Sequence, residues 1–295
     1  MPTPKNRLAA RAHAHPVAAS LIVMLLYIIL RRSSYFLFRN VLPQTGAVSV
    51  IYELVDAVWP FLLVAAFGCL RAYRKGGFFR TLLFGIPLIL YGAIPFVENM
   101  LGLFSEPDLV WQTPLMMLWG IVPYLFIGFR EESVFRGIVI DLFADKMKDR
   151  RGVLTVAVFS AFLFGIMHMQ NVFIGQTFFG SLIQSVNAFF LGLLLVAVYL
   201  RGGNLWALML IHAFIDFGIS AKEALTVTYR ADAITAAANS NTETSVDAGY
   251  VISMLIFWAL YTAIALFLLR KKKCGEIVER FSSGEQSSLS ESEKN

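Results

Sequence analysis

The sequence predicts an all-α membrane protein, a single bundle of about eight transmembrane helices. Two observations predict this class. Hydrophobic residues make up 57% of the 295 residues and charged residues only 15%, with a mean hydropathy of +0.66, which is far more apolar than a soluble domain of this length. The apolar residues also fall into separate runs, most of them near the roughly 20 residues that cross a bilayer.

The first apolar run, 16–30, follows the basic residues Lys5, Arg7 and Arg11. This arrangement resembles a signal peptide, but the sequence RRSSYF follows where small residues would mark a cleavage site, so we expect a first span. Arg31 and Arg32 would end this span or reach to the interface. The later predicted spans are 47–70, 79–104, 112–140, 153–169, 177–200, 204–221 and 249–269.

Basic residues in the short connections predict how the bundle is oriented. The basic connections RAYRKGGFFR, KMKDRR and RKKK alternate with SEPD and with the uncharged MQNVFIGQ. This alternation predicts that both termini are cytoplasmic, although the segment 31–46 carries three arginines on the opposite side. The connection 222–248 is long enough to hold an external helix or a cover.

The chain divides into three predicted parts. Residues 1–15 form a cytoplasmic tail, 16–270 one transmembrane domain and 271–295 a second cytoplasmic tail, predicted to be disordered because it is rich in Ser and Glu. The formal charge of +5 lies at the ends of apolar runs, where anionic lipid headgroups attract it, so we expect membrane lipid and no nucleic acid as a partner. Cys69 and Cys274 show no CxxC or CxxH spacing, which predicts neither a disulfide nor a thiolate metal site.

The stretch 129–140, FREESVFRGIVI, places ionisable residues in an apolar run. Each costs roughly 2.5 to 3.5 kcal/mol in hydrocarbon unless it has a partner or a purpose. On a helix, Glu132 and Arg136 are four residues apart and pair on one face. Glu131 is rotated by about 100° and has no such partner. We therefore expect Glu132 and Arg136 to be structural and Glu131 to be a free carboxylate, suited to a general base.

Two histidines lie in apolar helices outside the N-terminal tail, His168 and His212. Glu131 and His168 are each about 15 residues from the turn that joins their helices, so they can meet in an antiparallel hairpin. Asp216 follows His212 by four residues and shares its helical face. His212 lies only eight residues after Asn204, so its helix must begin deeper in the membrane, through a break at the two preceding glycines.

Three motifs stand in order along these helices: EESVFR, FGIMH with Phe164 and His168, and HAFID with His212 and Asp216. They resemble the Glu-Glu-x-x-x-Arg, Phe-x-x-x-His and His-x-x-x-Asn/Asp motifs of the CPBP intramembrane protease family. That family includes CAAX-processing endopeptidases of the Rce1 type and bacterial relatives linked to bacteriocin immunity. The resemblance covers residues 110–220.

The resemblance implies hydrolysis of a peptide bond within the membrane, on an eight-helix fold. Glu131 and His168 would activate a water, and His212 with Asp216 would stabilise the oxyanion. Prenyl-processing members usually carry Asn at the last position, and a charged Asp216 would repel an oxyanion, so it must be protonated or must orient His212. Phe164 would pack or line the pocket. The implied substrate is a peptide or a protein, including a lipidated one, and the implied location is a bacterial plasma membrane.

Other interpretations of the same residues stay open at this point. Glu131, His168 and His212 could hold one zinc ion, although the sequence lacks HExxH; we expect no cofactor. Buried ionisable residues also suit a proton-coupled transporter, but the chain shows no inverted repeat. A non-catalytic, peptide-binding immunity protein is the third candidate. Other polar residues in apolar runs are expected to be structural or interfacial: Glu53, Glu98 and Asn99.

Overall fold

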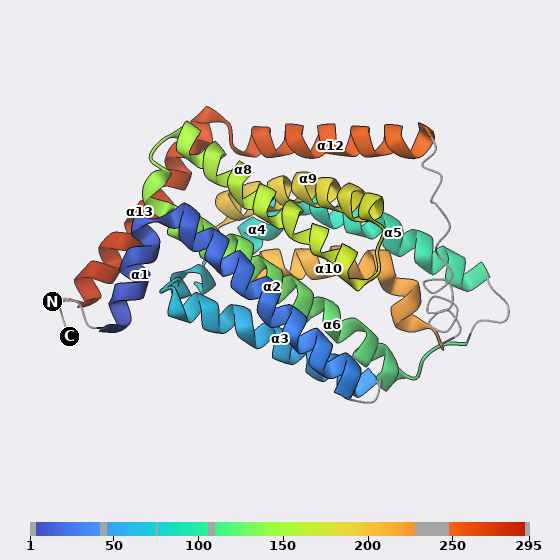
Figure 1. The fold of residues 1–295 in the computed structure, drawn as a ribbon. Helices are drawn as coiled ribbons and strands as arrows, with labels where there is room; N and C mark the ends of the chain where they lie inside the picture. The colour runs from blue at the N-terminus through green and yellow to red at the C-terminus, as the bar shows by residue number, and fades with distance from the viewer. Residues whose placement is uncertain (1–3, 42–45, 75, 106–109, 228–247, 293–295) are drawn as a thin grey trace.

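The computed structural model describes residues 4–41, 46–74, 76–105, 110–227 and 248–292 as helices joined by short connections (Figure 1). This confirms the all-α class. The longer helices are α2 (Pro16–Val41), α3 (Gly46–Ala66), α5 (Ile86–Ser105), α6 (Pro114–Glu132), α8 (Arg150–Met167), α9 (Phe178–Gly202), α10 (Leu205–Leu225), α12 (Ala248–Leu268) and α13 (Lys271–Ser292). The shorter ones are α1 (Pro4–Ala14), α4 (Phe78–Phe84) and α7 (Val139–Leu142).

Six helical segments in the described part of the chain are long and apolar enough to cross a membrane. They correspond to α2, α5, α8, α9, α10 and α12. The predicted spans at 47–70 and 112–140 fall on α3 and α6, which are not among the six. Helix α3 contains two charged residues, Glu53 and Asp56, and α6 ends on Arg130, Glu131 and Glu132. The count of about eight spans therefore stays a prediction.

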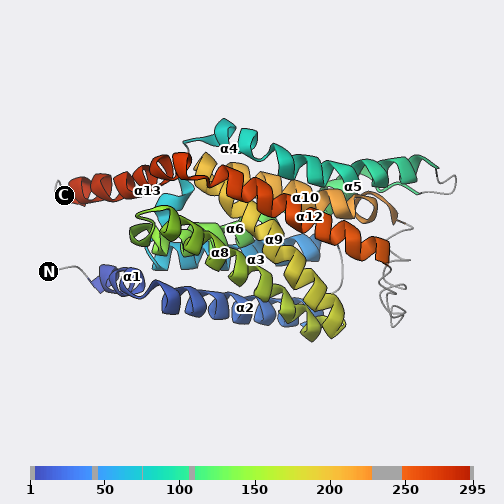
Figure 2. The same cartoon turned by 90° about the horizontal axis from the view of Figure 1, so that it is seen from above.

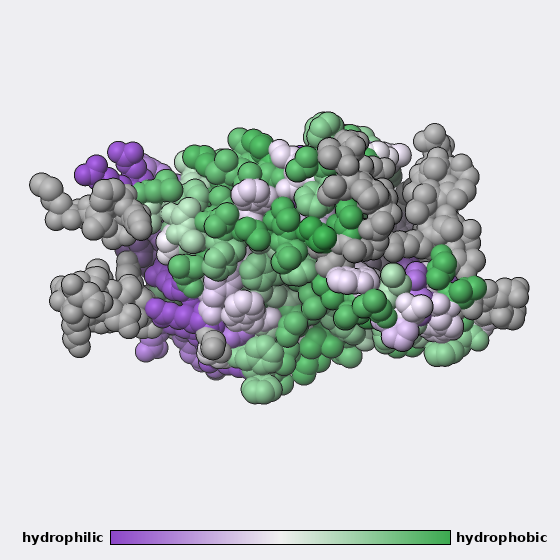
Figure 3. Space-filling model, turned by 90° about the horizontal axis from the view of Figure 1, so that it is seen from below, coloured by the Kyte–Doolittle hydropathy of each residue, from purple (hydrophilic) through white to green (hydrophobic). Residues whose placement is uncertain are grey.

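The surface has the pattern of an integral membrane protein. In Figure 2, α2 and α5 lie on opposite sides of the bundle with α9 and α10 between them. Figure 3 shows a hydrophobic band across the middle of one face and hydrophilic side chains at the end where α1 and α13 lie. The two terminal helices share that end (Figure 1), as the prediction of both termini on one side of the membrane requires.

The C-terminal segment corrects one prediction. Residues 271–295 were expected to be disordered, but α13 runs from Lys271 to Ser292. Its first turns bury Cys274 and Ile277 against the core, a contact that the Ser- and Glu-rich composition did not indicate. Glu276 accepts hydrogen bonds from Lys273 and Arg201, and these lower the pKa of its carboxyl to about 2. The predicted helix or cover at 222–248 lies largely outside the described residues.

Two glycines allow the close helix contacts that position the site. At Gly128 of α6, an added Cβ would lie 2.4 Å from the Met209 carbonyl oxygen of α10. At Gly165 of α8, it would lie 2.8 Å from the Ser185 carbonyl oxygen of α9. Small residues let membrane helices approach closely where no hydrophobic force drives them together. Each glycine lies three residues before a predicted catalytic residue, so backbone packing sets where those side chains stand.

The helix break expected before His212 is present. Helix α9 ends at Gly202, and Gly203 has a φ of +86°, a left-handed conformation that favours glycine. Asn204 then caps α10 by accepting a hydrogen bond from the Ala207 amide at 2.9 Å. The Asn204 side chain also donates to the carbonyl oxygens of Arg74 and Gly76, 3.3 and 3.0 Å away. The chain therefore reverses within a few residues and starts α10 among buried groups.

The stretch expected to be one helix changes type directly after the paired glutamates. Residues Ser133–Ile138 form a π-helix between α6 and α7, a rare conformation that is frequent at functional sites. Side-chain hydroxyls bind carbonyl groups along this region. Ser133 Oγ donates to the Phe129 oxygen at 2.5 Å, and Ser160 Oγ donates to the Phe135 oxygen at 2.7 Å. These bonds stabilise the widened turn that carries Arg136.

Candidate active site

The four predicted catalytic residues line one cavity of about 540 Å³. Glu131 comes from the end of α6, His168 follows α8, and His212 and Asp216 come from α10. A volume of this size is typical of sites that bury a small ligand or a stretch of peptide. The four side chains therefore line the same cavity, and their catalytic roles stay a prediction.

His168 presents one defined ring nitrogen to this cavity. Its Nδ1 lies 2.8 Å from the carbonyl oxygen of Phe164. A carbonyl oxygen only accepts, so Nδ1 carries the proton and donates it. In the neutral ring Nε2 is then an acceptor, which suits it to take a proton from water.

His212 is held by Glu132, one residue away from the proposed base. Its Nδ1 lies 2.6 Å from Glu132 Oε1, and Glu132 is fully buried. Because a carboxylate only accepts, Nδ1 is protonated and donates. On the other side of the ring, Nε2 lies 3.8 Å from Glu131 Oε2 and 3.6 Å from Asp216 Oδ2. These separations exceed a direct hydrogen bond, so Nε2 can serve a third atom between the carboxylates.

The predicted pair of Glu132 and Arg136 is confirmed, and it is part of a larger network. Arg136 Nη1 donates to Glu132 Oε1 at 2.9 Å, and Nη2 donates to the Gly192 carbonyl oxygen at 3.0 Å. Both charged side chains are fully buried. The chain of contacts runs from Gly192 through Arg136 and Glu132 to His212. The pair is thus both structural and the support of a site histidine.

Phe164 is the packing element common to both histidines. Its ring contacts His168 and His212 edge-on, with centroids 5.1 and 5.8 Å apart. The Arg136 guanidinium lies over the same ring, 4.5 Å from its centroid, a favourable cation–π geometry. Phe164 also lines the cavity. It therefore combines the two roles predicted for it, packing and pocket wall.

A second charged cluster, which spacing arguments did not find, adjoins Glu131. Arg130 is ion-paired with Glu53 and lies 3.3 Å from Asp56 Oδ2 through Nη1. Arg31 Nε lies 3.6 Å from the same Asp56 oxygen. Both arginines reach the cavity wall. We name Arg31, Glu53, Asp56 and Arg130 the α3 charge cluster. Within it, Glu53 is ion-paired with Arg130, which agrees with the structural role expected for Glu53, and Arg31 lies beside Asp56.

Another part of the cavity wall comes mainly from α9 and α12, with Tyr91 from α5 and Asn171 from the 3-10 helix His168–Ile174. Asn187 accepts a hydrogen bond from Trp258 Nε1 at 2.6 Å, and Asn171 Nδ2 donates to Gln184 at 2.9 Å. These amides lie among aromatic side chains that line the same wall, namely Tyr91, Tyr250, Phe257, Trp258 and Tyr261. Amides in an apolar wall are suited to a peptide backbone, which needs both donors and acceptors.

The alternative of a zinc ion held by Glu131, His168 and His212 stays a prediction. The ligand atoms of Glu131, His168 and His212 do not all lie within 4.8 Å of one another, whereas one other group among the described residues meets this condition. The Nδ1 atom of His212 is bonded to Glu132, and Nε2 is the ring nitrogen that faces the cavity carboxylates. The steps proposed below are written for the residues alone.

A comparison with protein families covers this same part of the chain. Residues 113–218 match the family described as "Type II CAAX prenyl endopeptidase Rce1-like". This segment is similar to that family. The resemblance drawn from the three motifs is thereby confirmed, and all four cavity residues fall inside the Rce1-like segment. No curated protein and no solved structure is significantly similar to the chain.

At the level of the family, the Rce1-like match supports an intramembrane CAAX-type endopeptidase. Such a protein takes a peptide or protein substrate in the membrane. The apolar helices agree with this, and the chain is an integral membrane protein. Its location in a bacterial plasma membrane stays a prediction.

Proposed function

We propose that the chain is an intramembrane endopeptidase in which Glu131 is the general base. The observation that carries the proposal is the single cavity lined by Glu131, His168, His212 and Asp216. Glu131 has a side chain that is 7% exposed and borders this cavity, whereas its neighbour Glu132 is fully buried and bonded. Only one of the two adjacent carboxylates is therefore placed to meet a substrate.

In the proposed reaction, Glu131 and His168 activate a water in the cavity. The water oxygen attacks the scissile carbonyl carbon while its proton passes to one of these two groups, Glu131 Oε or His168 Nε2. The carbon–nitrogen bond then breaks as the same proton is delivered to the leaving amine. A general base of this kind contributes about 10² to 10⁴-fold to the rate.

His212 is proposed to stabilise the negative charge that develops on the carbonyl oxygen. Glu132 keeps Nδ1 protonated and favours the positively charged ring, whose Nε2–H then donates to the oxyanion. Asp216, with a side chain 28% exposed and Oδ2 3.6 Å from Nε2, would hold the charged ring in place. This assigns Asp216 to orientation rather than to direct contact with the oxyanion, which a carboxylate would repel.

A prenylated substrate is proposed from the family description and from a second cavity. This cavity has a volume of about 490 Å³ and borders α6 at Phe129, two residues before Glu131. Its lining is apolar and includes Leu54, Val58, Phe61 and Leu125. A hydrocarbon chain would pack against these side chains through van der Waals contacts, since the surrounding lipid is equally apolar and adds no hydrophobic driving force.

The test is cleavage of a peptide by the purified chain in lipid nanodiscs. The probe is a fluorogenic peptide with a prenylated cysteine fourth from its carboxyl end, beside the same peptide without the prenyl group. We expect cleavage of the prenylated peptide, and its loss in Glu131→Gln. The matched control is Glu98→Gln, a change at an exposed glutamate of α5, which should cleave at the wild-type rate. Full activity in Glu131→Gln, or proton-coupled solute flux without cleavage, would overturn the proposal.

A further inference from the structure

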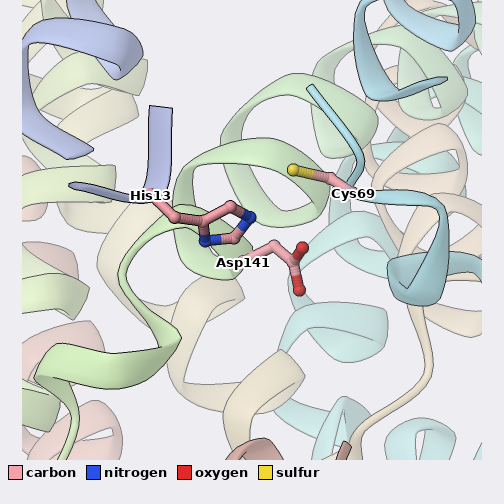
Figure 4. Close-up of side chains that lie close together, drawn as sticks. All are labelled: His13, Cys69 and Asp141. Atoms are coloured by element: carbon pink, nitrogen blue, oxygen red, sulfur yellow. The ribbon is translucent and has the colours of Figure 1, made fainter. Parts of the chain in front are cut away.

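A second cluster of chemically competent side chains lies away from the cavity, at the end of the bundle that carries α1. It consists of His13 on α1, Cys69 in the turn after α3, and Asp141 on α7. One ligand atom from each lies within 4.8 Å of the other two. Figure 4 shows the imidazole, the sulfur and the carboxylate facing a common space from three separate segments.

The burial of this cluster makes it unlike a chance surface grouping. Cys69 is fully buried, Asp141 is 5% exposed, and His13 is half-buried. Asp141 is ion-paired with Arg71 through Oδ1. Its other oxygen, Oδ2, is buried, and the partner that this carboxylate has besides Arg71 among the described residues is the Cys69 thiol. A thiol is a weak donor, so this buried carboxylate oxygen is poorly satisfied and a cation beside it would stabilise it.

We propose that His13, Cys69 and Asp141 bind one zinc ion. The donor set selects the metal. A thiolate is a poor ligand for Mg²⁺ or Ca²⁺, a carboxylate is a poor ligand for Cu(I), and sulfur, imidazole and carboxylate together suit Zn²⁺. Three protein ligands leave the fourth tetrahedral position to a water.

The geometry requires a small contraction on binding. Zinc bonds of about 2.0 to 2.3 Å place tetrahedral ligand atoms about 3.4 to 3.8 Å apart, and the three ligand atoms lie within 4.8 Å of one another, so the cluster closes by at most about 1 Å. His13 can supply this movement because it lies in the last turn of a terminal helix. Cys69 binds zinc as the thiolate, so binding releases the thiol proton to solvent, while a carboxylate oxygen of Asp141 and a ring nitrogen of His13 each donate a lone pair.

Bound zinc would link α1, through His13, to Cys69 and Asp141 of the core, and we call this link the metal clasp. Asp141 lies on α7, which directly follows the π-helix that carries Arg136. Zinc would therefore tie α1 to the segment that supports the candidate active site. The clasp stabilises this end of the bundle and is separate from the proposed peptide hydrolysis, which uses none of the three residues.

Cobalt binding to the full-length chain in detergent tests this site. After removal of bound metal by EDTA, added Co²⁺ should produce the thiolate-to-cobalt charge-transfer band together with visible tetrahedral bands. Cys69→Ser should lose the charge-transfer band, and Cys274→Ser, at the other buried cysteine, should keep it. His13→Ala should weaken binding by at least about 100-fold, and His15→Ala, at an exposed histidine two residues away, should not.

Zinc content measures the same proposal without cobalt. Chain purified without chelator should hold one zinc per molecule, which persists in Glu131→Gln and is lost in Cys69→Ser. Removal of the zinc should lower the unfolding midpoint by about 3 °C or more in the wild type and leave that of Cys69→Ser unchanged. If the folded wild-type chain gives no thiolate–cobalt band, the three side chains interact through hydrogen bonds and do not bind a metal ion. Zinc lost in Glu131→Gln would place the ion in the cavity. Either result overturns the proposal.

Discussion

The cavity and the α3 charge cluster meet at Arg130 and Glu131, two adjacent residues of α6. The charge of Arg130 is neutralised by ion pairs, whereas Glu131 lines the cavity. At Arg130, the guanidinium is enclosed by the acidic side chains of Glu53 and Asp56. At Glu131, the carboxylate borders a cavity with His212 Nε2 still 3.8 Å away. Ionisable groups in a membrane are retained because they pair or because they do chemistry. The comparison indicates that the α3 charge cluster has a structural role and that the cavity is the candidate active site.

Removing the buried arginine should give the largest effect on folding. Arg130→Met leaves Glu53 and Asp56 with Arg31 as their cationic neighbour, and breaking a buried pair in this way costs about 3 to 5 kcal/mol. We expect a lower thermal unfolding midpoint in nanodiscs, with cleavage per folded molecule reduced much less. The double variant Arg130→Met/Glu53→Gln should recover part of the loss. An unchanged midpoint for the single variant would show that the cluster is not structural.

His168→Ala tests the cavity side of the comparison and should have the next largest effect. The Nδ1 hydrogen bond to the Phe164 carbonyl is one local contact, so folding should change by about 1 kcal/mol. Loss of the proposed proton acceptor Nε2 should lower kcat about 10² to 10³-fold. Both are read from steady-state cleavage of the prenylated peptide and from the unfolding midpoint. Wild-type kcat in this variant would remove His168 from the mechanism.

Asp216→Asn should have the smallest effect, because it keeps the shape and the family accepts Asn at this position. A neutral amide can still hold His212, so we expect kcat to change by less than about tenfold in either direction. Tenfold corresponds to about 1.4 kcal/mol in the activation free energy. The pH profile of cleavage distinguishes orientation of His212 by Asp216 from direct proton transfer by Asp216. If Asp216 orients His212, loss of the carboxylate should shift the part of the profile that reports the ionisation of His212. A loss beyond 10³-fold would mean that Asp216 itself takes part in proton transfer.

The sequence was informative at positions where an ionisable side chain lies in an apolar helix. Glu131, His168, His212 and Asp216 were predicted because ionisable residues in apolar helices are rare, and helical spacing placed Asp216 with His212. Arg130 was missed although it precedes Glu131, because its partners lie on α3 and no spacing rule links two helices. The same reason hides the cluster of His13, Cys69 and Asp141, whose members come from three distant segments.

Local conformation was harder to predict than residue identity. The π-helix at Ser133–Ile138 depends on hydroxyl groups from its surroundings, such as Ser160 on α8 and Tyr73, which donates to Ser133 Oγ at 2.8 Å. Tertiary hydrogen bonds of this kind leave no periodic pattern. Helix α13 was taken for a disordered tail from the Ser- and Glu-rich composition of its C-terminal part, which gives no sign that Cys274 and Ile277 in its first turns are buried.

The most direct measurement compares two isosteric variants of adjacent residues, Glu131→Gln and Glu132→Gln, in the same nanodiscs. Single-turnover cleavage and the unfolding midpoint are recorded for each. We predict that Glu131→Gln cleaves at least about 10³-fold more slowly with a midpoint within a few degrees of the wild type. Glu132→Gln, which leaves the buried Arg136 unpaired, should unfold roughly 10 °C lower. Wild-type cleavage by Glu131→Gln, or a loss of activity that only follows its unfolding, would contradict the assignment of Glu131 as the base.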